Sequence, residues 1–160
     1  PDGSGHTILT GIGISNGLGW SPDSKVMYYT DSLDNTIYQF DYDLASGDIT
    51  NQRPFVQLPK DEHEIVPDGL CVDSEGHVWS AQWNGWQIVR YDPQGNPVAV
   101  VKVPAQRVTS CCFGGKNLDT LFITTSRADL SEEALMSQPQ AGDLFVTKVD
   151  TQGQETNLFG

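Results

Sequence analysis

The sequence predicts an all-β protein built from repeated units of short strands. Three observations lead to this fold class. Glycine and proline are frequent, with 16 and 9 residues in a chain of 160, which is typical of a protein with many turns. Runs that favour helices are few, whereas Tyr, Trp, Val and Ile recur in short segments of the kind that form strands. One pattern of residues also appears three times, starting near residues 16, 68 and 109.

The first unit is expected to occupy residues 16–67, and residues 1–15 are expected to end a preceding unit. The leading segment combines a glycine-rich turn with a predicted strand at 6–10. Within the unit, the Ser-Pro-Asp-Ser run at 21–24 has the composition of a turn between two strands. The predicted strands are 18–20, 26–31, 36–42 and a fourth near 49–50 or 55–58.

The second unit is expected at residues 68–108. Pro67 fixes its own φ and disfavours helix at the residue before it, while Gly69 lets backbone or a ligand approach the neighbouring acid. Turn residues at 73–76, 84–85 and 92–95 separate the segments that favour strands. The predicted strands are 70–72, 78–82, 87–91 and 97–103.

The third unit is expected at residues 109–160. Its predicted strands are 111–113, 120–124, 143–149 and a last one near 156–159. Between the second and third of these strands, residues 131–136 form the one stretch with helical character. Ser131 suits the N-cap of a short helix, and the two glutamates after it suit its first turn.

The three units superpose in register, because residues 18–20 match 70–72 and 111–113. Four-stranded units repeated at this spacing are typical of β-propeller blades, and a blade must stack on neighbours to bury both faces. About three blades do not close a ring. We therefore expect either an N-terminal half or a second chain to complete the propeller, and we favour the first. The start of the chain, without Met or a signal-peptide pattern, also suits the interior of a longer chain.

Composition narrows the partners and the compartment. The net charge of −12 argues against a nucleic-acid partner, because no basic patch is available to displace phosphate counterions. No apolar run approaches the roughly 20 residues that cross a membrane, so no membrane partner is expected. Cys71, Cys111 and Cys112 lack a metal-binding spacing. We interpret all three as buried free thiols, which favours a reducing, cytoplasmic location.

The main functional clue is a pair of polar residues at the start of two inner strands. Asn16 in Ser-Asn-Gly-Leu and Asp68 in Pro-Asp-Gly-Leu occupy equivalent positions. Inner strands of a propeller converge on its axis, so we expect both side chains to point into one tunnel. An amide oxygen and a carboxylate are hard donors that suit Ca²⁺, Mg²⁺, Mn²⁺ or, with less preference, Zn²⁺. The alternatives are an Asx-type cap for Asp68 and a hairpin turn at Asn16 and Gly17.

Other candidate groups give weaker signals. The acidic run at 41–43 resembles a calcium loop but lacks its twelfth-position Glu. His63 has no second histidine at a metal-binding spacing, and no Gly-x-Ser-x-Gly motif is present. Three tryptophans are interpreted as packing between units rather than as the walls of a sugar site; they are Trp79, Trp83 and Trp86.

Several motifs, taken in order, resemble the senescence marker protein, or regucalcin, group of gluconolactonases. They are ISNGLGWS at 14–21, YYTDS at 28–32, FDYD at 40–43, PDG at 67–69, TSCCFGGKN at 109–117 and QPQAG at 138–142. Together they span nearly the whole chain, and so many matches in the same order are hard to reach by chance. Luciferin-regenerating enzymes resemble the chain through the same motifs.

The resemblance implies a six-bladed propeller with one divalent metal in its central tunnel, Ca²⁺ first and Zn²⁺, Mg²⁺ or Mn²⁺ as alternatives. In that family a Glu near the N-terminus, the Asn of Ser-Asn-Gly-Leu and the Asp of Pro-Asp-Gly hold the metal. The last two correspond to Asn16 and Asp68. The Glu has no counterpart in this chain, nor do the Arg and Asn that hold substrate hydroxyls. The chain would then be the C-terminal half of such a protein.

The activity implied by the resemblance is metal-dependent hydrolysis of sugar lactones. The metal would polarise the lactone carbonyl, and Asp68 would be the catalytic residue that assists the attacking water. Residues that bind the substrate are not identified by the sequence. The alternatives are a calcium-binding regulatory protein without significant turnover and an enzyme of the luciferin-regenerating kind. An isolated half with two of three ligands is expected to bind metal weakly or not at all.

Overall fold

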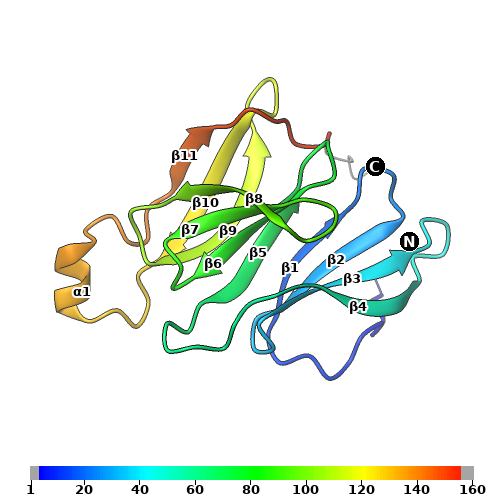
Figure 1. The fold of residues 1–160 in the computed structure, drawn as a ribbon, viewed down its shortest axis with the longest axis horizontal. Coiled ribbons are helices and arrows are strands. Elements are labelled where there is room, and N and C mark those ends of the chain that lie inside the picture. The colour runs from blue at the N-terminus through cyan, green and yellow to red at the C-terminus, as the bar shows by residue number, and fades with distance from the viewer. Residues whose placement is uncertain (1–3, 156–160) are drawn as a thin grey trace.

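The computed structural model describes residues 4–155, which form three antiparallel sheets and one short helix. Figure 1 shows the sheets side by side in chain order, with the helix at the end farthest from the first sheet. Within these residues the strands of each sheet follow one another without a crossover. No helix in this part of the chain has the length and apolar character that crossing a bilayer requires.

The first sheet consists of β1 (Ser15–Trp20), β2 (Val26–Asp31), β3 (Thr36–Tyr42) and β4 (Ile49–Gln57). The second consists of β5 (Val66–Val72), β6 (Val78–Trp83), β7 (Gln87–Tyr91) and β8 (Pro97–Lys102). The third contains β9 (Arg107–Gly114), β10 (Thr120–Ser126) and β11 (Phe145–Lys148), with α1 (Glu132–Ser137) between the last two. The all-β prediction is confirmed by these three sheets. Turn residues separate successive strands where the sequence indicates them.

Two predicted strands have a different outcome. Residues 6–10 form no strand, so that prediction is wrong: they pair with none of the strands in the described part of the chain. The strand predicted near 156–159 lies outside the described residues. The predicted helix is confirmed, since the Ser131 hydroxyl accepts a hydrogen bond from the backbone N–H of Ala134 at 3.1 Å.

The hydrophobic core is divided between the two sheet–sheet interfaces. The first cluster joins sheets one and two and contains Tyr28, Ile37, Val56, Leu70, Val72, Val78, Val89 and Tyr91. The second joins sheets two and three and contains Trp79, Ala81, Ile88, Val103, Ala105, Val108, Cys111, Leu121, Ile123 and Ala141. Because β6 and β7 contribute buried residues to both clusters, the middle sheet is covered on both faces.

The outward faces of the first and third sheets remain open to solvent. Leu18 and Trp20 are exposed on β1. In the third sheet, Cys112 on β9 and Val146 on β11 are exposed on either side of β10. Cys112 and Val146 both pair with Phe122, so they lie on one face of the third sheet. The prediction that all three cysteines are buried is therefore wrong for Cys112, because the side chains of a strand alternate between its two faces.

Candidate functional site

The first strand of each described sheet, β1, β5 or β9, is its inner strand and contacts the inner strand of a neighbouring sheet. Each inner strand has a break in its regular pairing at the equivalent position. In β1, Asn16 and Gly17 together lie opposite one residue of β2, and in β5, Asp68 and Gly69 together lie opposite one residue of β6. In β9, Thr109 is the extra residue between neighbours that pair regularly with β10. Each is a β-bulge, which redirects side chains and is common beside active sites. The bulges are the structural form of the repeat seen in the sequence.

These bulges correct the local structure predicted for the two candidate ligands. Asn16 and Asp68 were expected just before their strands, but both lie inside them. The hairpin-turn interpretation of Asn16 and Gly17 is wrong for the same reason. For Asp68, the backbone N–H of Gly69 acts to lower the pKa of the carboxyl group, and this is the kind of local interaction that the cap interpretation implies.

Glycine after each polar residue brings neighbouring inner strands into direct contact. A Cβ atom on Gly17 would lie 2.6 Å from the backbone oxygen of Asp68 and 2.7 Å from the backbone nitrogen of Leu70. A Cβ atom on Gly69 would lie 2.3 Å from the hydroxyl oxygen of Ser110. Real side chains essentially never approach so closely, so only glycine permits this spacing. The glycines thereby set how near Asn16 comes to Asp68.

The structure brings the two predicted site residues together. Burial raises the pKa of Asp68 to about 6, while a side-chain hydrogen bond from Asn16 and the N–H of Gly69 act in the opposite direction. None of the ion pairs described for residues 4–155 involves Asp68. A partly buried carboxylate without a cationic partner is costly unless a proton or a cation neutralises it.

A serine that the sequence analysis did not select completes this arrangement. The Ser32 hydroxyl donates to the backbone oxygen of Pro67 at 2.7 Å and accepts from Asn16 Nδ2 at 3.2 Å. The chain entering β1 is fixed nearby, because the Asp31 carboxylate accepts the backbone N–H groups of Gly13 and Ile14 at 2.9 and 3.0 Å. The YYTDS motif was the available signal, although spacing alone did not show that Ser32 reaches the second sheet.

The donor set fits a hard divalent cation. The Oδ1 atom of Asn16 accepts no hydrogen bond from any described residue. The contact of this amide with the Asp68 carboxylate is made through Nδ2, because a carboxylate can only accept. An amide oxygen beside a carboxylate suits Ca²⁺, Mg²⁺ or Mn²⁺. Two protein donors fill only part of the six to eight positions that Ca²⁺ takes. The remaining ligands would come from water or from residues outside 4–155.

A second acidic group looks like a metal site but is already occupied by protein donors. Ligand atoms of Asp73, Glu75 and His77 lie within 4.8 Å of one another. The Asp73 carboxylate, however, accepts from the backbone N–H groups of Glu75 and His77, from Trp79 Nε1 and from Arg90 Nε. Arg90 also pairs with Glu75 at 2.6 Å. We interpret this group as a network that fixes the β5–β6 turn.

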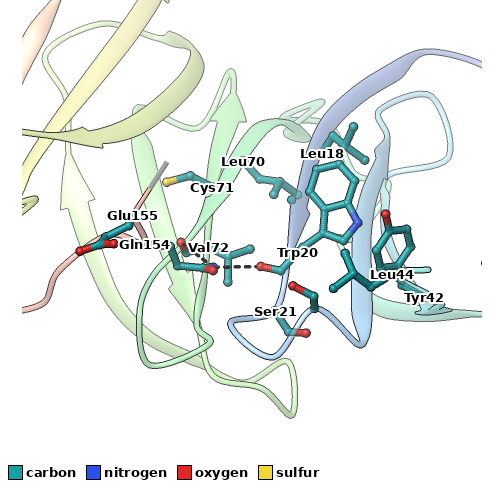
Figure 2. Close-up of a pocket in the computed structure, with 12 residues that line it drawn as sticks. Leu18, Trp20, Ser21, Tyr42, Leu44, Leu70, Cys71, Val72, Gln154 and Glu155 are labelled. Carbon is teal, nitrogen blue, oxygen red and sulfur yellow. Dashed lines mark hydrogen bonds between the residues drawn. The ribbon is translucent and has the colours of Figure 1, made fainter. Parts of the chain in front are cut away.

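The hollow shown in Figure 2 lies toward the opposite end of β1 and β5 from Asn16 and Asp68. It measures about 590 Å³, and its mixed lining includes the apolar Leu18 and Leu70 and the polar Ser21. Gln154 crosses it, and its Nε2 donates to the backbone oxygens of Trp20 and Val72 at 2.9 and 3.3 Å. This contact joins the first two sheets without touching the Asn16–Asp68 pair.

The tryptophans largely serve packing, as predicted. Trp79 packs edge-on against Phe113 of the third sheet, with ring centroids 5.7 Å apart, and the Arg107 guanidinium lies 4.8 Å from the centre of the Trp83 ring. These contacts join the second and third sheets. Trp86 differs, since its side chain is exposed.

Comparison with known proteins places the chain in one family. The model of the SMP-30/Gluconolactonase/LRE-like region matches residues 1–127. The chain is 44% identical to regucalcin of Homo sapiens over 146 residues, which are 91% of the chain and 48% of that protein. The chain thus spans about half the length of the curated relatives it matches.

Solved structures give the same picture. A luciferin-regenerating enzyme superposes with a TM-score of 0.79 at 37% identity, covering 89% of this chain and 48% of its own. A calcium-binding protein, regucalcin, from Agrobacterium tumefaciens gives 0.86 at 29% identity, with coverage of 92% and 50%. A gluconolactonase from Xanthomonas campestris gives 0.63 at 29% identity, with coverage of 78% and 39%.

Proposed function

The chain belongs to the SMP-30/gluconolactonase/LRE-like family, and we propose that it supplies half of the active centre of a divalent-metal-dependent hydrolase of sugar lactones. In this proposal the chain forms three blades of a six-bladed ring. The other blades come from an N-terminal half or from a second chain. Asn16 and Asp68 are the metal ligands of this half, and Asp68 is also its catalytic residue.

The observation that carries the proposal is the state of Asp68. Its carboxylate is partly buried and has no cationic partner among residues 4–155. It lies near the Asn16 amide, whose oxygen accepts no hydrogen bond from this part of the chain. Burial of this kind is unfavourable in a purely structural residue. Perturbed acids of this kind cluster at functional sites.

The chemistry divides between the cation and the chain. A divalent cation held by Asn16 and Asp68 would polarise the carbonyl of a bound lactone and stabilise the developing oxyanion, an effect worth about several kcal/mol. The carboxylate of Asp68 would orient the attacking water and accept its proton. Positive charge nearby lowers the pKa of Asp68 and so weakens it as a base. The two roles therefore limit each other.

The test is hydrolysis of D-glucono-δ-lactone by the full-length gene product, followed as acid release. We expect turnover that is lost after treatment with a chelator and restored by a divalent cation. Comparing Ca²⁺, Mg²⁺, Mn²⁺ and Zn²⁺ then identifies the metal that supports the reaction. Turnover that survives complete removal of metal would contradict the proposal.

A second candidate is calcium binding without significant turnover, as in a regulatory protein. It is supported by the structural relative described as a calcium-binding protein and by the oxygen donors at the site. The same preparation separates the two functions when calorimetry with Ca²⁺ is added. Calcium binding without lactone hydrolysis favours the regulatory role, whereas binding together with hydrolysis favours the enzyme.

A further inference from the structure

Ser32 lies where the first two sheets meet at the candidate metal site. It follows β2 directly, and only 5% of its surface is exposed. Its backbone N–H donates to the backbone oxygen of Ile14 at 3.1 Å, while its backbone oxygen accepts from the N–H of Asn35. Its main chain is therefore held by the residue before β1 and by the turn before β3, and the hydroxyl remains available for other groups.

The hydrogen-bond capacity of a hydroxyl fixes the direction of each Ser32 contact. A serine hydroxyl has one hydrogen, and Ser32 donates it to the backbone oxygen of Pro67 at 2.7 Å. Toward Asn16 the hydroxyl can then only accept, so the amide must present Nδ2, at 3.2 Å. The other amide atom, Oδ1, is consequently turned away from Ser32 and stays free of protein donors among residues 4–155.

We propose that Ser32 is a positioning residue for the metal, because it fixes the Asn16 side-chain amide with Oδ1 directed to the cation. The proposal rests on the proposed function. Only Oδ1 can ligate a hard cation, since Nδ2 carries two hydrogens and is a donor. Through Pro67, the same hydroxyl also ties this orientation to the residue that precedes Asp68. One side chain thus positions candidate metal ligands of two sheets relative to each other.

The first test compares Ser32→Ala with a matched control in the full-length gene product. Gln154→Ala also removes side-chain hydrogen bonds to main-chain oxygens of the first two sheets, but it leaves Asn16 untouched. After removal of metal with a chelator, affinity for Ca²⁺ is measured by calorimetry. We expect about tenfold weaker binding for Ser32→Ala, as for other residues that orient a metal ligand, and unchanged binding for Gln154→Ala. Equal losses in both variants, or no loss in either, would overturn the proposal.

A second comparison isolates the orientation of the amide. In an Asn16→Asp background both terminal atoms of the side chain are oxygens, so either orientation of the group directs a possible ligand to the cation. Ser32→Ala should then change Ca²⁺ affinity by less than about twofold, against about tenfold in the Asn16 background. An equal loss in both backgrounds would show that Ser32 acts on stability alone. Ser32→Cys, with a similar shape and a weak donor, serves if the alanine variant does not fold.

The results distinguish this inference from the proposed function. If the unmodified protein binds Ca²⁺ and Ser32→Ala binds it equally well, the inference fails and the proposed function stands. If the unmodified protein binds none of Ca²⁺, Mg²⁺, Mn²⁺ or Zn²⁺, both the proposed function and the inference about Ser32 fail. Thermal unfolding of each variant, recorded in parallel, confirms that the compared proteins are folded.

Discussion

Two carboxylates near the inner strands, Asp31 and Asp68, have pKa values displaced in opposite directions. Burial opposes ionisation of both. For Asp31, the N–H groups of Ile14, Gly13 and Leu33 outweigh this effect and lower its pKa. For Asp68, burial prevails and the pKa rises to about 6. The charged form of Asp31 therefore stabilises the folded chain. The charged form of Asp68 destabilises it, so Asp68 is the carboxylate that a bound cation would stabilise.

The Asp31 carboxylate should make stability depend on acid pH. Its pKa is lower in the folded chain than in the unfolded chain, so its contribution is complete well above the unfolded value of about 4. That contribution is lost as pH falls through the folded value. Asp31→Asn should therefore lower the free energy of unfolding by about 1–3 kcal/mol at pH 7, and by much less at the lowest pH at which both proteins fold. Urea unfolding at both pH values measures this, and an equal effect at both would contradict the assignment.

Asp68→Asn should have the opposite effect on the metal-free protein. The substitution removes a partly buried charge whose folded pKa, about 6, lies above the unfolded value. At pH 7 and with chelator present, we expect the variant to be more stable by roughly 1–2 kcal/mol. Added Ca²⁺ should raise the unfolding temperature of the unmodified protein and leave that of the variant unchanged. A variant that is less stable in chelator would indicate a structural role for Asp68.

The sequence identified part of this site at the level of residues. Asn16 and Asp68 were found because each occupies the same place in a repeated motif. Ser32 was not, because its partner Pro67 lies 35 positions along the chain, and such a contact becomes visible only once the sheets are stacked. The Asp73–Arg90 network was missed because it joins the end of β5 to β7 across β6, 17 positions apart within one sheet.

At the level of elements, strand positions were predicted closely and their irregularities were not. The segments 26–31, 36–42 and 87–91 match β2, β3 and β7, because alternating side chains and turn residues mark their ends. The bulges of β1, β5 and β9 were predicted as loops or strand starts. In sequence, a polar residue followed by glycine is typical of a turn. The structure shows strand pairing on both sides of the Asn16–Gly17 and Asp68–Gly69 pairs, so each is a bulge within a strand.

The contact at Gly69 gives an element-scale prediction. Gly69→Ala would place a Cβ atom 2.3 Å from the Ser110 hydroxyl oxygen, which forces β5 and β9 apart. We expect a loss of about 1–3 kcal/mol in the free energy of unfolding, as for other overpacked interiors. Gly5→Ala is the control, because nothing lies within 4 Å of the added atom. Chemical denaturation measures both, and equal stabilities would show that β5 and β9 tolerate a wider spacing.

At the level of the whole molecule, the family and the all-β fold were predicted and are confirmed. The sequence also predicted units that need neighbours, in keeping with the exposed faces of the first and third sheets. What covers these faces stays a prediction, either an N-terminal half or a second chain. The pattern of apolar residues shows that a strand face needs cover, but it does not specify the partner.

Cys112 provides a direct probe of that cover. Its thiol is exposed on the outward face of the third sheet. Cys71 and Cys111 lie between sheets with sulfurs 3.6 Å apart, and contact with Cys111 together with burial raises the pKa of Cys71. If a further blade packs on the third sheet, alkylation of Cys112 should be at least about tenfold slower in the full-length gene product than in this chain alone. Equal rates would show that the face stays uncovered, and Cys71 and Cys111 should react slowly throughout.

The repeated bulge also separates the chemistry of the molecule from its architecture. Positions 16, 68 and 109 hold an amide, a carboxylate and a hydroxyl on the same backbone irregularity. Because backbone groups make the ladder hydrogen bonds, a substitution at one of these positions changes the side chain that the bulge presents more than it changes the strand pairing. A scaffold of this kind can acquire new ligands or reactions by single substitutions, without a new fold.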